Sequence, residues 1–126
     1  MPATTRILII DDNPDIRALL EDSLRPAGYE VCVAANGSEA LKQFTAAPAD
    51  LVITDLFMPG LDGFETISQL RHRFGKVPIL AISGHDNAPT FLTMAGNIGA
   101  VGVLQKPFTP EELLAEVRRI LHPDPH

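Results

Sequence analysis

The stretch LVITDLFMPGLDG, residues 51–63, places an aspartate, Asp55, directly after four residues suited to a buried strand. Pro59 and Gly60 follow shortly and predict a turn that carries the chain away. An ionised carboxylate at the end of an apolar strand is costly unless another group pairs with it. We therefore expect the rest of the chain to supply a partner for Asp55.

Four other apolar runs of strand length occur in the chain, and all five runs are continuous in hydrophobicity. Continuous runs are typical of strands that are covered on both faces, as in a parallel sheet. The five runs are RILII (6–10), EVCVA (30–34), LVIT (51–54), VPILAIS (77–83) and VGVLQ (101–105).

Helical patterns separate these runs. Apolar residues recur at the spacing of one helix face in 16–27, 91–98 and 113–121, and weaker patterns occupy 37–47 and 63–74. The motif TPEE (109–112) predicts a capped helix start, and either Asp12 or Asn13, before Pro14, predicts another. Alternating strands and helices predict an α/β fold with an open, doubly wound parallel sheet.

Length and composition narrow the class of protein. A chain of 126 residues predicts a single domain, 1–126. The net charge of -6 and the absence of a basic cluster argue against direct contact with nucleic acid. Cys32, the single cysteine, lies in an apolar run and is expected to be a buried small hydrophobe. The first residues contain no run long enough for a signal or a membrane span, so we expect a cytoplasmic protein without membrane contact.

Polar residues gather at the carboxyl ends of the predicted strands, where open α/β sheets bind ligands. Any one of them alone could be a strand terminator or a helix cap. Together they include three carboxylates, and two like charges about 4 Å apart repel by roughly 4 kcal/mol at an effective dielectric near 20. Oxygen ligands without a nearby His or Cys pair favour Mg²⁺, or Mn²⁺. The residues are Asp11, Asp12, Asp55, Ser83 and Lys106.

The order of motifs resembles the receiver domain of two-component response regulators. These motifs are DD (11–12), TDxxMPxxDG (54–63), Ser83-Gly84 and KPF (106–108), and the resemblance extends from Arg6 to Leu121. It implies a flavodoxin-like receiver fold, a five-stranded parallel sheet of order 2-1-3-4-5 with five helices, whose core is residues 6–121.

The resemblance implies roles for four residues of the DD and TDxxMPxxDG motifs. Asp55 matches the phosphoacceptor, which takes a phosphoryl group from a histidine kinase or a histidine phosphotransfer protein. Asp12 and Asp55 match carboxylate ligands of Mg²⁺, Asp11 matches the residue that holds a metal-bound water, and the backbone carbonyl of Phe57 completes the metal site. Such a domain catalyses only its own phosphorylation and dephosphorylation.

Ser83 and Lys106 match the residues that bind the phosphoryl oxygens, and the resemblance also implies a cis peptide bond between Lys106 and Pro107. A metaphosphate-like transition state spreads charge over three oxygens, so a cation and a hydroxyl donor suit this role on physical grounds as well.

Three positions concern the conformational response to phosphorylation and the lifetime of the phosphoryl group. Val103 stands three residues before Lys106, where the family has an aromatic residue that reports phosphorylation, so the usual read-out is in doubt. Phe57 and His85 occupy positions that influence dephosphorylation in the family. The alternative is that Phe57 only covers the site and that His85 is a solvated loop residue.

The resemblance further implies a downstream protein target, or a fused effector outside this chain. It leaves open a homodimer through the face made by the fourth helix, the fifth strand and the last helix. Two other functions were compared with it. A haloacid-dehalogenase-type phosphatase needs a second Asp where this chain has Phe57, and a flavin phosphate would be repelled by the acidic loop DDNPDIR (11–17). The sequence contains no GxxxxGK[ST] motif, which argues against nucleotide hydrolysis.

Overall fold

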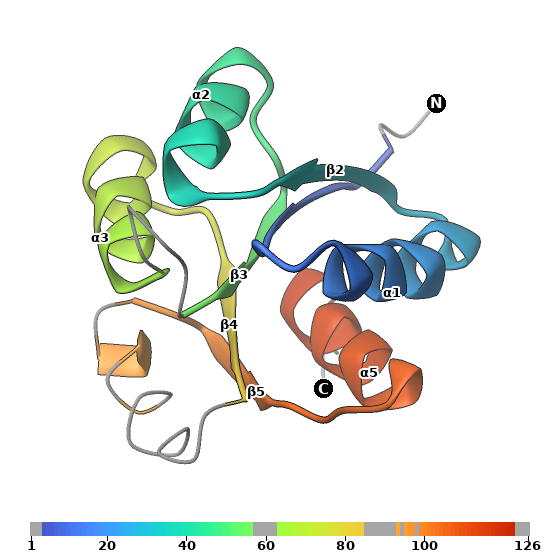
Figure 1. The fold of residues 1–126 in the computed structure, drawn as a ribbon. Helices are drawn as coiled ribbons and strands as arrows, with labels where there is room; N and C mark the ends of the chain where they lie inside the picture. Colours follow the sequence, from blue (N-terminus) through green and yellow to red (C-terminus); the bar gives the residue numbers. More distant parts are fainter. Residues whose placement is uncertain (1–3, 57–62, 85–92, 94, 98, 123–126) are drawn as a thin grey trace.

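Five parallel strands form one sheet in the order β2-β1-β3-β4-β5 (Figure 1). The computed structural model describes residues 4–56, 63–84, 93, 95–97 and 99–122. The predicted doubly wound sheet and its strand order are confirmed. The strands are β1 (Arg6–Ile10), β2 (Glu30–Ala34), β3 (Leu51–Asp55), β4 (Ile79–Ser83) and β5 (Gly102–Gln105).

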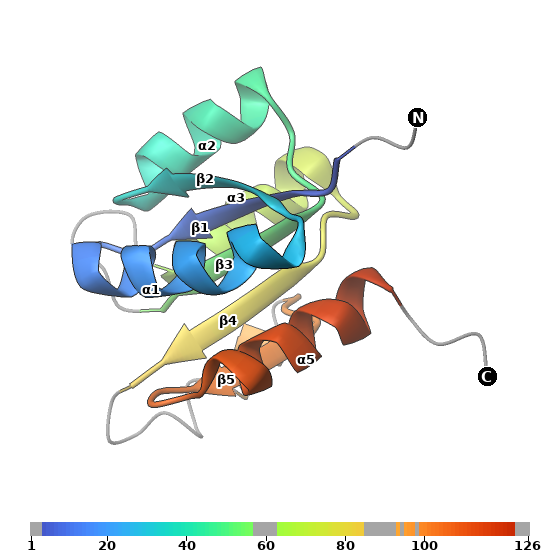
Figure 2. The same cartoon turned by 90° about the vertical axis from the view of Figure 1, so that its right-hand side faces the viewer.

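Helices cover both faces of this sheet. Helices α1 and α5 lie on one face, and α2 and α3 lie on the other (Figures 1 and 2). Residues 93 and 95–97 are helical and belong to the predicted fourth helix, the rest of which lies outside the described residues. In the part of the chain that is described, no helix is long and apolar enough to cross a membrane. The bounds are α1 (Pro14–Leu24), the short 3-10 helix η1 (Arg25–Ala27), α2 (Gly37–Ala46), α3 (Gly63–Phe74) and α5 (Pro110–Leu121).

The core consists of two apolar layers, one on each face of the sheet. In β1, Ile7 and Ile9 pack toward α1 and α5, whereas Leu8 and Ile10 pack toward α2 and α3. Successive side chains of a strand point to opposite faces, so a central strand must be apolar at every position. The continuous hydrophobicity of the predicted strands has this origin.

The two edge strands are less covered than the central ones. Cys32 in β2 is half-buried, so the prediction of a buried cysteine was only partly right. Val103 in β5 is 42% exposed. An edge strand has a neighbour on one side only, and its side chains therefore lie at the margin of the helix layers.

The helix starts follow the predicted signals. Thr109 caps α5 in a capping box with Glu112, as expected. Asn13 caps α1, because its side chain accepts hydrogen bonds from the backbone N–H groups of Asp15 at 2.8 Å and Ile16 at 3.4 Å. The sequence had left Asp12 and Asn13 as alternatives, and this choice leaves the Asp12 carboxylate available for another role.

Three strand bounds differ from the prediction. Strand β5 begins at Gly102 and not at residue 101. Strand β4 begins at Ile79 and not at residue 77, because Pro78 has no N–H to add to the ladder. The carbonyl of Pro78 still accepts a hydrogen bond of 3.0 Å from Val52 N–H. Strand β3 includes Asp55, which pairs in register with Ile82 of β4. The carboxylate is therefore carried by the last residue of the strand itself.

Candidate functional site

Three carboxylates meet at the carboxyl ends of β1 and β3. One carboxylate oxygen from each of Asp11, Asp12 and Asp55 lies within 4.8 Å of the other two. Asp11 is fully buried, Asp55 is 7% exposed, and Asp12 is exposed. These residues come together because β1 and β3 are neighbours in the sheet, although many residues separate them in the sequence.

Lys106 is the partner of the two buried carboxylates. Its Nζ lies 3.4 Å from Asp11 Oδ2 and 3.7 Å from Asp55 Oδ2. Its backbone N–H donates to the Ser83 carbonyl at 2.8 Å, which joins the segment after β5 to the end of β4. The peptide bond between Lys106 and Pro107 is cis. Lys106 thus supplies the opposite charge that a buried carboxylate requires.

Backbone groups hold Asp11 on its other side. Asp11 Oδ1 accepts a hydrogen bond of 2.9 Å from Asn13 N–H, while Oδ2 faces the Lys106 ammonium. Arg17 donates to the Asp11 carbonyl at 2.8 Å. The same short segment therefore caps α1 through the Asn13 side chain and orients Asp11 through the Asn13 backbone.

The backbone around Asp55 is tightly packed. A Cβ atom on Gly63 would overlap the Asp55 carbonyl oxygen and would lie 2.5 Å from Leu56 Cα. Gly63 N–H donates to the Leu56 carbonyl at 3.2 Å, and the Thr54 hydroxyl donates to the Asp55 carbonyl at 2.9 Å. Neither Gly63 nor Thr54 was singled out from the sequence. The Asp-Gly pair between a strand and a helix was the available signal for Gly63.

Lys106 also has a glycine beside it. A Cβ atom on Gly84 would lie 3.1 Å from Lys106 Cβ and 3.2 Å from Lys106 Cδ. The methylene chain of the lysine therefore runs close along the backbone after β4. Gly84 follows Ser83 in the sequence motif, but its contact with Lys106 could be recognised only in the folded chain.

The remaining predicted residues are placed as follows. Ser83 is fully buried as the last residue of β4, between the ends of β3 and β5. Val103 lies on the edge strand and does not belong to the carboxylate cluster. Phe57 and His85 lie outside the described residues.

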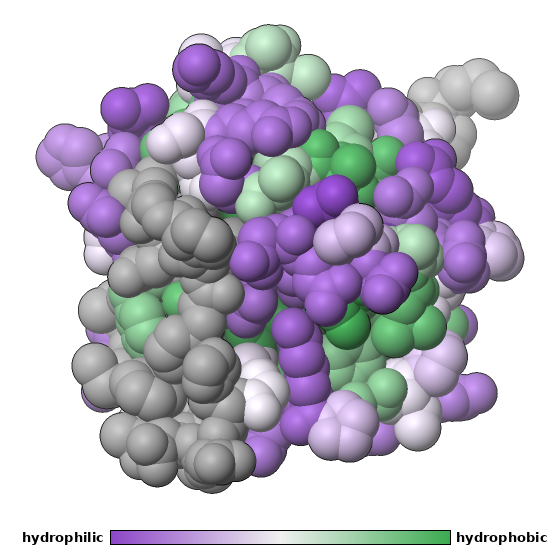
Figure 3. All heavy atoms as spheres, viewed as in Figure 1, coloured by the Kyte–Doolittle hydropathy of each residue, from purple (hydrophilic) through white to green (hydrophobic). Residues whose placement is uncertain are grey.

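The face that carries the strand ends is mainly polar. Figure 3 shows hydrophilic residues across the middle of the face seen in Figure 1, with apolar residues on either side. Carboxylate oxygens are the ligands that Mg²⁺ prefers, and Mg²⁺ is usually held by one or two of them together with water. The donor set and the mutual distances of Asp11, Asp12 and Asp55 fit such an ion.

Comparison with known proteins identifies the family. The model of the response regulator receiver domain family matches residues 7–118. The chain is similar to the solved chemotaxis protein CheY4 of Vibrio cholerae, with 37% identity and a TM-score of 0.88 over 94% of this chain and 100% of that one. It is also similar to the receiver domain of NtrX from Brucella abortus, with 31% identity and a TM-score of 0.88 over 94% and 99% of the two chains.

Two curated relatives are longer. The transcriptional regulatory protein PhoP for alkaline phosphatase synthesis in Bacillus subtilis is 38% identical over 92% of this chain and 48% of its own length. The transcriptional regulatory protein PrrA of Mycobacterium tuberculosis is 38% identical over 92% of this chain and 49% of its own length. The chain thus spans about half the length of these relatives, and the expectation that it contacts no nucleic acid stays a prediction from its charge.

Proposed function

Because this chain belongs to the response regulator receiver domain family, we propose that it is a phosphorylation switch in which Asp55 accepts a phosphoryl group from a phosphohistidine. The observation that carries the proposal is the meeting of three carboxylates with one ammonium group. Lys106 Nζ lies 3.7 Å from Asp55 Oδ2, and Asp11 and Asp12 lie beside it. Asp55 is the member of this cluster that matches the phosphoacceptor of the family.

In the proposed reaction, a carboxylate oxygen of Asp55 attacks the phosphorus of the donor. The new P–O bond forms as the P–N bond to the donor imidazole breaks. The imidazole leaves with the electron pair of that bond and takes up a proton from solvent. Because the transition state spreads negative charge over three oxygens, the Lys106 ammonium and the Ser83 hydroxyl would stabilise it as counter-charge and donor.

Mg²⁺ or Mn²⁺ would be held by Asp11, Asp12 and Asp55, with the Phe57 carbonyl as a further ligand and Asp11 acting through a bound water. When bound, the ion supplies positive charge to the phosphoryl oxygens. Asp11 Oδ1 is already engaged by Asn13 N–H and its Oδ2 by Lys106, which supports an indirect role for Asp11. Asp12 is exposed and free of the helix-capping role that Asn13 performs.

The phosphodonor is proposed to be a histidine kinase or a histidine phosphotransfer protein. An apolar pocket of about 390 Å³ opens beside Lys106, lined by Ile16, Leu19, Pro107 and Phe108 together with Gly84. Leu19 is 41% exposed there. Apolar surface next to a reactive carboxylate suits a protein donor, because a small phosphorylated metabolite would not need it.

Phosphorylation would add about -1.5 to -2 charges and three acceptor oxygens at the end of β3. The domain would respond by changing its contacts with a downstream protein or with an effector outside this chain, in the cytoplasm. Its catalysis would be limited to gaining and losing its own phosphoryl group.

The test is phosphorylation by a small-molecule phosphodonor in the presence of Mg²⁺, followed by intact mass spectrometry. The expected product is a single added phosphoryl group in the unaltered chain. It should be missing in Asp55→Asn and after chelation of the metal. Asp22→Asn, an exposed acid of α1 outside the cluster, is the matched control and should be phosphorylated normally. An unaltered chain that stays unmodified would overturn the proposal.

A further inference from the structure

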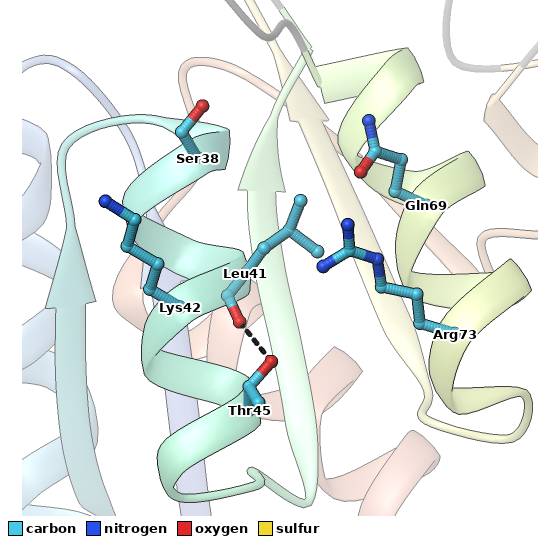
Figure 4. A pocket seen from close by; sticks show the side chains of 6 residues that line it. All are labelled: Ser38, Leu41, Lys42, Thr45, Gln69 and Arg73. Atoms are coloured by element: carbon cyan, nitrogen blue, oxygen red, sulfur yellow. Dashed lines mark hydrogen bonds between the residues drawn. The ribbon is translucent and has the colours of Figure 1, made fainter.

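We propose that the groove between α2 and α3 is a docking surface for an acidic segment of a partner protein. The groove has a volume of about 490 Å³ and lies between the two helices on one face of the sheet (Figure 4). It does not include any residue of the carboxylate cluster. Its lining residues are Ser38, Leu41, Lys42, Thr45, Gln69 and Arg73.

The groove carries two cations and no acid. Lys42 comes from α2 and Arg73 from α3, and Figure 4 shows Arg73 reaching from its helix toward Leu41 of the other. Both are exposed, and within the described part of the chain neither forms an ion pair, whereas Lys106 pairs with two carboxylates. The chain has a net charge of -6, whereas the lining of this groove is positively charged.

Three neutral polar side chains, Ser38, Thr45 and Gln69, also line the groove. Ser38 and Gln69 make no side-chain hydrogen bond within the described residues, so both remain available to a ligand. Thr45 donates to the Leu41 carbonyl at 2.8 Å and keeps its oxygen lone pairs (Figure 4). Leu41 is buried and forms an apolar wall, which strengthens the field of the neighbouring cations because it excludes water.

These features favour carboxylates of a protein over the phosphates of a nucleic acid. The lining contains no aromatic side chain on which a base could stack. The net charge of -6 repels a long polyanion, and only two cations are available to oppose it. A short acidic segment needs few charges, and an arginine can hold a carboxylate through two parallel hydrogen bonds.

The probe for this surface is a capped, fluorescein-labelled peptide of alternating Glu and Ala. Its binding is measured by fluorescence anisotropy at about 0.1 M salt, where the Debye length is about 10 Å. The double variant Lys42→Glu with Arg73→Glu should bind about tenfold more weakly or worse, because both attractive charges become repulsive. Lys76→Glu with Arg118→Glu makes the same change in net charge at exposed residues that do not line the groove. This control should weaken binding by less than about threefold, since salt screens distant charges.

Backbone amide shifts in NMR spectra locate the peptide independently. The largest shifts are expected at Lys42, Thr45, Gln69 and Arg73. Circular dichroism checks that each variant is folded, and the neutral pair Lys42→Gln with Arg73→Gln should weaken binding to an intermediate degree. Equal weakening by the groove and control pairs, absence of binding by the folded chain, or shifts confined to another surface would each overturn the proposal.

Two other occupants are outcomes of the same experiment. If a duplex DNA oligonucleotide displaces the peptide from the groove at lower concentration, the occupant of the groove is a nucleic acid and not an acidic segment. If the chain self-associates in sedimentation and Lys42→Glu with Arg73→Glu abolishes this association, the occupant is a second copy of the chain. Asp55 does not line the groove, so Asp55→Asn should bind the peptide unchanged. Failure of the docking proposal and failure of the proposed phosphorylation can therefore be told apart.

Discussion

The carboxylate cluster and strand β5 differ in their exposure to solvent. In the cluster, Asp11 is fully buried and Asp55 is 7% exposed, and the Lys106 ammonium lies within 4 Å of both. On β5, Val103 is 42% exposed, and Val101 just before it is 48% exposed. The phosphoryl transfer that we propose for the cluster needs atoms held in one geometry, whereas a surface that reported the transfer would need only to remain accessible to a partner.

The same difference separates what this chain shares with its family from what it does not. The motifs around Asp11, Asp55, Ser83 and Lys106 follow the receiver pattern. By the resemblance drawn from the sequence, Val103 departs from it, and packing constrains this exposed side chain only weakly. We therefore expect substitutions to have the largest effect at the enclosed positions of the site and its backbone. The effect should be smaller at exposed positions.

The largest effect is expected from Lys106→Gln. Loss of the ammonium group should slow phosphorylation by a small-molecule donor about 100- to 1000-fold, because a positioned counter-charge in the transition state is removed. The rate is measured by intact mass over time. Lys76→Gln removes an exposed cation outside the cluster and should leave the rate unchanged. A Lys106→Gln rate within twofold of the original would mean that the ammonium group does not stabilise the transition state.

The next effect is expected from Gly63→Ala. The new methyl group would overlap the Asp55 carbonyl, so the free energy of unfolding should fall by about 1–3 kcal/mol. Urea denaturation measures the change. Gly96→Ala is the matched control, because Gly96 is helical and a Cβ there meets no atom within 4 Å. That variant should gain up to about 1 kcal/mol from better helix propensity. Equal results for the two variants would mean that the backbone at Asp55 is not tightly enclosed.

A smaller effect is expected from Asp12→Asn. The affinity for Mg²⁺ should fall about tenfold, because one charged oxygen ligand becomes neutral. Calorimetric titration measures the affinity, with Asp22→Asn as the control acid in α1. Because the Asp12 carboxylate lies within 4.8 Å of two other carboxylates and repels them, loss of its charge should raise the midpoint of thermal unfolding without metal. Unchanged Mg²⁺ affinity would remove Asp12 from the proposed metal site.

The smallest effect is expected from Val103→Tyr. At this exposed position the free energy of unfolding should change by less than about 0.5 kcal/mol, and the phosphorylation rate should not change. Ala81 pairs with Val103 in register but is fully buried, so Ala81→Val should cost about 1–3 kcal/mol. A Val103→Tyr variant that changed the phosphorylation rate as much as a site substitution would show that this exposed position contributes to the reaction.

Much of the site was visible in the sequence, because each strand end carries its own polar residue. The convergence of Asp11, Asp55 and Lys106 followed from the rule that parallel strands end at one edge. The contacts of Gly63 with Asp55 and of Gly84 with Lys106 did not, because they depend on how closely two backbone segments approach. The groove between α2 and α3 was also invisible, since Lys42 and Arg73 become neighbours of one cavity only when the helices pack together.

The sequence by itself determined the strands, most helix bounds and the set of polar groups at the strand ends, because these depend on local hydrophobic pattern and on residue type. The tertiary structure decided how deeply each element is covered. Strands β2 and β5 have the same apolar character as β1 and β3, yet Cys32 is half-buried and Val103 is exposed. Burial depends on neighbours that are distant in the chain, and the order of strands in the sheet decides which strands have a neighbour on only one side.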